Sequence, residues 1–185
     1  MSDYDARYYA YYKPVPYAWD QFYWLKFFEI IARRIAVTLH PSSALDVGCA
    51  VGFLVGALRA QSVYVEGVDI SAYAIGQTPV WLRPYCRLAS ALAPFGRTYD
   101  LITCIEVAEH LPASDAPALI ANLCQHTPLV LFSSTPDDTA EPTHLNVRPA
   151  AYWETLFFEH GFTWRMDYDA TFISPQARLY AAIQL

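Results

Sequence analysis

An amphipathic pattern dominates the first part of the chain. From Trp19 onward, apolar residues recur every three to four positions and charged residues occupy the opposite face. This pattern predicts a helix that continues to about His40, where Pro41 ends it. The preceding residues 1–17 are rich in tyrosine and contain two prolines, so we do not expect one continuous helix there.

Short apolar runs alternate with helical patterns in the rest of the chain. The runs predict strands at residues 44–47, 63–68, 86–89, 101–105 and 129–132. Helices are expected at residues 53–60, 72–77, 115–126 and between Pro149 and Gly161. Two final strands, 162–168 and 178–185, should pair antiparallel across a short loop that contains Pro175. This alternation predicts an α/β fold with a mostly parallel sheet.

Composition supports a folded chain and restricts its partners. The sequence has 185 residues, 55% of them hydrophobic and 16% charged, which suits a single domain over residues 1–185. We expect an N-terminal aromatic segment and helix over residues 1–40 and a Rossmann-like core over residues 41–185. The net charge of −6 disfavours nucleic acid as a partner, because a phosphate backbone would meet a repulsive surface on average.

The cysteines and the first residues of the chain bear on the expected cellular compartment. Cys49, Cys86, Cys104 and Cys124 lie in or beside apolar runs without a Cys-x-x-Cys pair, so we expect buried, reduced thiols. The N-terminus lacks an apolar signal core, and no apolar stretch reaches the roughly 18 residues needed to cross a bilayer. These features predict a cytoplasmic protein without a membrane partner.

A glycine-containing turn separates the first predicted strand from the next helix. Gly48 and Gly52 permit a tight turn and the close approach of a ligand to the backbone. Asp69 ends the second predicted strand, where a carboxylate can accept hydrogen bonds from both hydroxyls of a ribose. The context of strand, glycine turn and helix therefore predicts a site for a nucleoside-type ligand.

The spacing of the glycines distinguishes between nucleoside ligands. A dinucleotide site requires Gly-x-Gly-x-x-Gly to receive a pyrophosphate, and residues 48–52 lack that pattern. S-adenosylmethionine (SAM) carries no phosphate, and its amino group needs an acceptor near the turn. Asp46 can supply this acceptor directly or through water, so the residues favour SAM.

Residues 44–161 resemble the class I SAM-dependent methyltransferases. Residues 45–52 resemble the first motif of that family, with Ala50 in place of the glycine often found in its middle. Residues 68–71 resemble the second motif, whose acid binds the ribose, and residues 99–111 closely resemble the signature around the fourth strand. The resemblance implies a three-layer sandwich with a seven-stranded, mostly parallel sheet that ends in an antiparallel hairpin.

The resemblance and the glycine turn together indicate the residues that bind SAM. The candidates along the sheet are Asp46, Gly48, Cys49, Ala50, Gly52, Asp69, Ile70, Ser90, Ala91 and Glu106. In this class the segment before the first strand often closes over the cofactor. Candidates for such lid contacts are Tyr8, Tyr9, Tyr12, Tyr17 and Trp19. The alternative is that these aromatic side chains only pack against the rest of the protein.

A cluster of acids and histidines follows the fourth predicted strand. Glu106, Glu109 and His110 stand at positions i, i+3 and i+4, so one helical turn would place them on a single face, and His144 would complete the cluster. Small-RNA 3′-end methyltransferases bind a metal through a similar Glu-x-x-Glu-His arrangement. We expect magnesium, manganese or zinc here, with His110 or His144 as ligand or catalytic base. The alternatives are that Glu106 contacts the cofactor, Glu109 caps a helix and His110 anchors the loop.

The resemblance also indicates the acceptor. Residues 106–110 and 134–136 are similar to ubiquinone-biosynthesis-type O-methyltransferases, which implies methyl transfer to a small hydroxylated acceptor, aromatic or sugar-like. The acceptor pocket is expected between the N-terminal segment and the loop 136–148. Three alternatives remain: methylation of nitrogen or carbon instead of oxygen, methylation of a terminal RNA ribose, and a SAM-binding subunit without activity. The last is suggested by Ala50 and by Ser90, which stands where many relatives carry aspartate.

Overall fold

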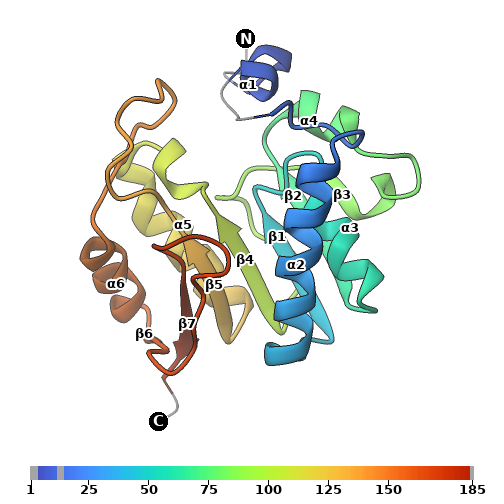
Figure 1. The fold of residues 1–185 in the computed structure, drawn as a ribbon. Coiled ribbons are helices and arrows are strands. Elements are labelled where there is room, and N and C mark those ends of the chain that lie inside the picture. The colour runs from blue at the N-terminus through green and yellow to red at the C-terminus, as the bar shows by residue number, and fades with distance from the viewer. Residues whose placement is uncertain (1–3, 12–14, 184–185) are drawn as a thin grey trace. The chain divides into compact units, whose positions relative to one another are not determined.

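The computed structural model describes residues 4–11 and 15–183, and the chain divides into two compact units, Met1–Ser90 and Ala91–Leu185 (Figure 1). The helices of the first unit are α1 (Ala6–Tyr11), α2 (Phe22–Leu39), α3 (Phe53–Ala60), α4 (Ala72–Gln77) and the 3₁₀ helix η1 (Arg83–Tyr85). Its strands are β1 (Ser43–Val47), β2 (Tyr64–Asp69) and β3 (Cys86–Leu88), in the parallel order β3-β2-β1.

Local sequence explains where the helices of the first unit begin and end. The α2 helix ends at Leu39. His40 follows it in a left-handed conformation with φ 49°, and Pro41 comes next. At the start of α4, the Ser71 hydroxyl accepts a hydrogen bond from the amide of Ala74. Helices α2 and α3 pack side by side, and α3 also packs on β2 (Figure 1).

The second unit contains the other four strands. These are β4 (Leu101–Ile105), β5 (Leu129–Ser133), β6 (Phe162–Trp164) and β7 (Arg178–Ala182), in the order β4-β5-β7-β6. The β4–β5 pair is parallel, whereas β7 pairs antiparallel with both β5 and β6. The helices are η2 (Ala108–His110), η3 (Ala113–Asp115), α5 (Ala116–His126) and α6 (Ala150–Glu159).

An aromatic core stabilises the second unit. Phe157 of α6 stacks on Tyr180 of β7 with ring centroids 3.8 Å apart, and both side chains are almost fully buried. Phe132 of β5 and Trp153 of α6 pack against each other at 5.2 Å. Burial of side chains of this size contributes roughly 1.5–3 kcal/mol each, so these contacts hold α6 on the sheet.

The structure confirms the predicted fold class. The seven strands are mostly parallel, and the C-terminal pair β6–β7 is antiparallel. The predicted burial of the cysteines holds for Cys49, Cys86 and Cys104, whereas Cys124 is partly exposed. Among the described residues, no helix combines the length and the apolar character needed to cross a membrane.

Strand β6 is clearly shorter than the sequence indicated. The prediction placed a strand over residues 162–168, but β6 ends at Trp164. Arg165 forms two hydrogen bonds with Asp167, at 2.7 and 2.6 Å, and the amide of Tyr168 donates to the carbonyl of Arg165. These contacts turn the chain immediately after β6, so the connection to β7 extends over residues 165–177 and is longer than predicted.

Candidate functional site

The turn after β1 has the geometry that its glycines predict. Gly48 and Gly52 adopt φ values of 80° and 86°, which side chains disfavour. The amides of Gly48 and Cys49 both donate to the carbonyl of Val68 at 2.8 and 3.0 Å, and Gly52 N donates to Cys49 O at 2.8 Å. The turn is therefore fixed to the end of β2 by its own backbone.

Ala50 occupies the left-handed region, with φ 49°, at the centre of this turn. A left-handed conformation costs a non-glycine residue roughly 1–2 kcal/mol. The amide of Ala50 donates to Asp69 Oδ2 at 2.7 Å, and a hydrogen bond to a charged group contributes roughly 1.5–3 kcal/mol. This bond offsets the strain, which explains how alanine keeps the turn in a position where glycine is expected.

Asp69 connects the glycine turn to the start of α4. Its Oδ1 accepts from Ser71 N at 2.7 Å while Oδ2 accepts from Ala50 N. Burial raises the pKa of the Asp69 carboxyl, and the backbone hydrogen bonds oppose that rise. Each carboxylate oxygen has a second lone pair, so the carboxylate can still accept ribose hydroxyls. Ribose binding by Asp69 stays a prediction.

The other candidate cofactor-binding residues differ in their exposure to solvent. Asp46 is buried in β1, and its charge adds to the effect of burial in raising the pKa of the Tyr17 hydroxyl. Ile70 is 61% exposed just beyond β2, and Ser90 is partly exposed at the end of the first unit. In the second unit, the Ala91 carbonyl accepts a hydrogen bond from Asn122 Nδ2 at 2.8 Å.

The N-terminal aromatic side chains pack within the first unit. Trp19 Nε1 donates to the carbonyl of Val51 at 2.9 Å, and the Tyr17 ring lies 4.9 Å from that of Phe53. The Ser71 hydroxyl donates to the carbonyl of Tyr4, which brings the chain start onto the loop after β2. Tyr8 and Tyr9 are buried in the same cluster, whereas Tyr12 lies outside the described residues. These contacts favour aromatic packing, and a lid role stays a prediction.

In the second unit, Glu109 is a buried carboxyl without a compensating charge. Its Oε1 accepts from Thr135 N at 3.4 Å, and its buried Oε2 has no hydrogen-bond partner among the described residues. Burial, followed by the charge of Glu106, raises the pKa of Glu109 to about 8. A buried carboxyl of this kind holds a proton or requires a cation.

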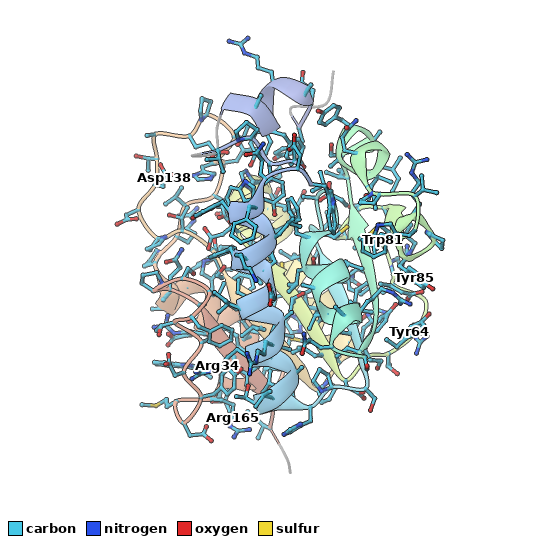
Figure 2. The ribbon with its side chains drawn as sticks, turned by 45° about the vertical axis from the view of Figure 1, so that its right-hand side comes forward. Arg34, Tyr64, Trp81, Tyr85, Asp138 and Arg165 are labelled. Carbon is cyan, nitrogen blue, oxygen red and sulfur yellow. The ribbon has the colours of Figure 1, made fainter. Side chains whose placement is uncertain are left out.

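Two histidines next to Glu109 are oriented by backbone carbonyls. His110 Nδ1 lies 3.2 Å from the carbonyl oxygen of Thr143, and His144 Nδ1 lies 2.7 Å from that of Asp138. A carbonyl oxygen only accepts, so each Nδ1 carries a proton. The two rings are 4.8 Å apart, and Figure 2 labels Asp138 in the loop that carries His144.

These side chains form a candidate metal centre. Glu109, His110 and His144 offer ligand atoms that all lie within 4.8 Å of one another. The amides of Leu145 and Asn146 donate to the carbonyl of Glu109 at 2.8 and 2.9 Å, which fixes the loop that carries His144 beside η2. The buried Glu109 Oε2 and the two adjacent imidazoles are side chains of the kinds that bind divalent cations.

Glu106 does not belong to that group of ligand atoms. The sequence predicted one helical turn through residues 106–110, but Glu106 has a left-handed φ of 52° and lies outside η2. Its Oε1 accepts a hydrogen bond from Gln176 Nε2 at 3.0 Å. Glu106 therefore lies beside Glu109 as a second carboxylate, close enough to raise its pKa.

Sequence reasoning missed Glu141, which extends the cluster. Asp138, Glu141 and His144 form a second group of candidate ligands, and Glu141 Oε2 lies 3.4 Å from His144 Nε2. The spacing of three residues between Glu141 and His144 was visible in the sequence. The loop is not a long helix, however, so that spacing alone did not predict proximity.

The family is shown by comparison with known proteins. Residues 19–171 match the family described as the methyltransferase domain, so the chain belongs to that family. The ubiquinone biosynthesis O-methyltransferase of Burkholderia multivorans is 33% identical over 105 residues, which cover 52% of this chain and 45% of that protein. The chain thus spans about half the length of the curated relatives it matches.

Two solved structures show the same fold. The magnesium protoporphyrin IX methyltransferase of Synechocystis PCC 6803 with bound SAH aligns with a TM-score of 0.67 and 19% identity, and covers 87% of this chain and 83% of that one. The methyltransferase domain of bacterial CtHen1-C aligns with a TM-score of 0.61 and 20% identity, and covers 86% and 100%. The fold and the family match identify the chain as a class I SAM-dependent methyltransferase by family.

Proposed function

We propose that this protein transfers a methyl group from SAM to a hydroxyl oxygen of a small-molecule acceptor, assisted by a divalent ion at Glu109, His110 and His144. The observation that carries the proposal is the buried Glu109 Oε2, which has no hydrogen-bond partner among the described residues, grouped with the imidazoles of His110 and His144. The O-methyltransferase relatives support a hydroxyl target.

In this reaction, alignment of the acceptor oxygen, the methyl carbon and the sulfur matters more than acid–base catalysis. The bond from the acceptor oxygen to the methyl carbon forms as the carbon–sulfur bond breaks, and the hydroxyl proton must leave. Alignment can contribute up to about 7–11 kcal/mol, and proton removal by a positioned base adds roughly 10²- to 10⁴-fold. A group near the acceptor oxygen that favours the alkoxide or phenolate is therefore useful.

Residues of each unit have separate roles in this proposal. In the first unit, the turn at residues 48–52 and Asp69 hold the cofactor through backbone and carboxylate contacts. In the second unit, Glu109, His110 and His144 hold the ion, which supplies Lewis acidity when bound. The Glu106 carboxylate lies beside this group and accepts the hydroxyl proton. Two imidazoles with carboxylates favour manganese, iron or zinc over magnesium.

Manganese titration tests the ion site directly. Calorimetry with MnCl₂ is expected to show one site in the native protein and roughly 10- to 100-fold weaker binding after His144→Ala or Glu109→Gln. His160, an exposed histidine at the end of α6, supplies the matched control, and His160→Ala should bind Mn²⁺ like the native protein. Equal affinity in all four proteins would exclude the site.

Stability should depend on pH in a way that reports on Glu109. Its pKa is about 8 in the folded protein and near 4.3 in an unfolded chain, so between these values the folded state retains a proton that the unfolded state has released. Stability of the metal-free protein therefore falls from pH 5 to pH 8, by on the order of 2–4 kcal/mol. Mn²⁺ should remove the fall, because it replaces the proton as the compensating charge.

Urea unfolding at pH 5, 6.5 and 8 measures this effect, with EDTA in one series and MnCl₂ in the other. Glu109→Gln carries no titrating group at this position, so its stability should lack the decline and should respond to Mn²⁺ more weakly than that of the native protein. A decline of the same size in Glu109→Gln would assign the pH dependence to other groups.

A second candidate function is methylation of a terminal RNA ribose. The cluster of Glu109, His110 and His144 favours it, because small-RNA 3′-end methyltransferases have a similar metal-binding arrangement, and the net charge of −6 opposes it. Binding of a short single-stranded RNA that weakens steeply between 50 and about 200 mM salt would support this function over the small-molecule proposal.

A further inference from the structure

The second unit contains a cavity of about 550 Å³ that the metal cluster does not use. It opens between the residues after β5, the first turns of α6, and β7. Phe132, Trp153 and Tyr180 form its aromatic wall, and Ser134, Gln176 and Arg178 are among its polar lining residues. A cavity of this volume falls within the range of small-molecule sites.

Three lining groups are buried polar atoms without hydrogen-bond partners among the described residues: Ser134 Oγ, Trp153 Nε1 and Arg178 Nε. Trp153 is 2% exposed and Ser134 is 5% exposed. An unsatisfied buried polar group costs roughly 1–3 kcal/mol, so three of them around one cavity are unusual unless a ligand bonds them. The indole and guanidinium groups only donate, so a complementary ligand presents acceptor oxygens.

Arg178 provides the positive charge of the cavity. Its guanidinium lies 4.3 Å from the centroid of the Trp164 ring. Its Nε is 3.1 Å from Glu154 Oε1, but this ion pair is not aligned as a hydrogen bond. The Nε–H donor therefore remains available to a carboxylate, although Glu154 and the lining residue Asp137 reduce the net charge.

The cavity wall is continuous with the candidate metal cluster of the same unit. Gln176 lines the cavity, and its Nε2 donates to Glu106 Oε1 at 3.0 Å. Thr135 also lines the cavity, and its amide donates to Glu109 Oε1. A ligand in the cavity would therefore have Glu106 and Glu109 just behind one wall and Arg178 in another.

We propose that this cavity binds the methyl acceptor, and that the acceptor is a flat hydroxylated aromatic carboxylate. The aromatic wall contacts the ring system, and the carboxylate accepts hydrogen bonds from Arg178 Nε, Trp153 Nε1 and Ser134 Oγ. The hydroxyl points to the side of Glu106 and Glu109. The role of this ligand as methyl acceptor rests on the proposed methyl transfer. Binding of the aromatic carboxylate in the cavity does not depend on that proposal.

Titration of the SAM-free protein with three ligands of similar shape tests the inference: 3-hydroxy-2-naphthoate, 2-naphthol and 2-naphthylmethylammonium. The carboxylate is expected to bind roughly tenfold more tightly than the neutral ligand, and the cation most weakly. Arg178→Gln should remove the preference for the carboxylate. Trp153→Phe keeps an aromatic ring and removes the N–H donor, so it should weaken carboxylate binding several-fold.

Arg165→Gln supplies the matched control, because Arg165 is an exposed arginine of the same unit that pairs with Asp167 (Figure 2). It should bind the carboxylate like the native protein. Thermal unfolding of each variant shows whether it folds. If Arg178→Gln does not fold, Trp153→Phe still tests the cavity. Equal affinity for the three ligands, or carboxylate binding that survives in folded Arg178→Gln and Trp153→Phe, overturns the inference.

Separate measurement of SAM binding distinguishes the two proposals. A protein that binds SAM but shows no preference for the carboxylate contradicts only the cavity inference. A protein that binds the carboxylate through Arg178 but does not bind SAM contradicts only the proposed function.

Discussion

Replacing Gly67 with alanine is expected to destabilise the protein by roughly 2–3 kcal/mol and to weaken SAM binding at the same time. Gly67 lies in the middle of β2, where an added Cβ would be 2.7 Å from both Cβ and Sγ of Cys49 and 2.8 Å from a methyl carbon of Val55. Real Cβ contacts are not this short, so the neighbours would have to move. Cys49 belongs to the glycine turn, and its displacement would disturb the proposed cofactor site.

The control for this variant is Gly76→Ala. Gly76 lies in α4, and an added Cβ there meets no atom within 4 Å. Alanine in a helix is favoured over glycine by roughly 0.5–1 kcal/mol, so this change should stabilise the protein slightly. Urea unfolding gives both free energies, and calorimetry gives SAM affinity. If Gly67→Ala were as stable as the native protein, the packing around β2 would differ from the structure.

Replacing Asp69 with alanine is expected to weaken SAM binding by roughly 1.5–3 kcal/mol, which is about 10- to 150-fold. The change removes the proposed acceptor of the ribose hydroxyls. It also removes the two hydrogen bonds by which Asp69 holds the amides of Ala50 and Ser71. The turn then loses the contact that offsets the left-handed conformation of Ala50, so a loss of folding stability should accompany the loss of affinity.

Asp69→Asn separates these contributions. Its amide oxygen can still accept from one backbone amide, whereas its NH₂ group cannot accept, so the SAM affinity should lie between those of the native and alanine proteins. Asp20→Ala removes an exposed acid of the same unit and should change nothing. Native SAM affinity in a folded Asp69→Ala protein would show that the ribose is bound elsewhere.

Local sequence determined most of the elements. The structure places β4, α3 and α4 at the residues that the sequence predicted, 101–105, 53–60 and 72–77. These segments have a clear period of apolar residues, and glycine, proline or a capping serine marks their ends. Such signals act over a few neighbouring residues and are therefore visible without any tertiary information. The glycine turn and Asp69 were visible for the same reason.

Backbone conformations and side-chain contacts that the apolar pattern does not record decided the remainder. Residues 162–168 have the apolar character of a strand, but β6 ends at Trp164 and a turn that contains the Arg165–Asp167 pair follows it. Glu106 shares the helical spacing of Glu109, yet its left-handed backbone places it outside the group of ligand atoms. The spacing and the composition do not show which carbonyl or side chain lies near a given residue in the folded chain.

The sequence by itself determined the class of this protein, because the class depends on short motifs and on the order of strands and helices. Only the tertiary structure showed that Thr143 and Asp138 orient the two imidazoles beside Glu109, and that a cavity with unpartnered donors adjoins them. These features depend on contacts between separate segments, such as the contact of His110 with Thr143 across 33 residues. Their free energies come from burial and from unsatisfied hydrogen bonds, which arise only when the chain is folded.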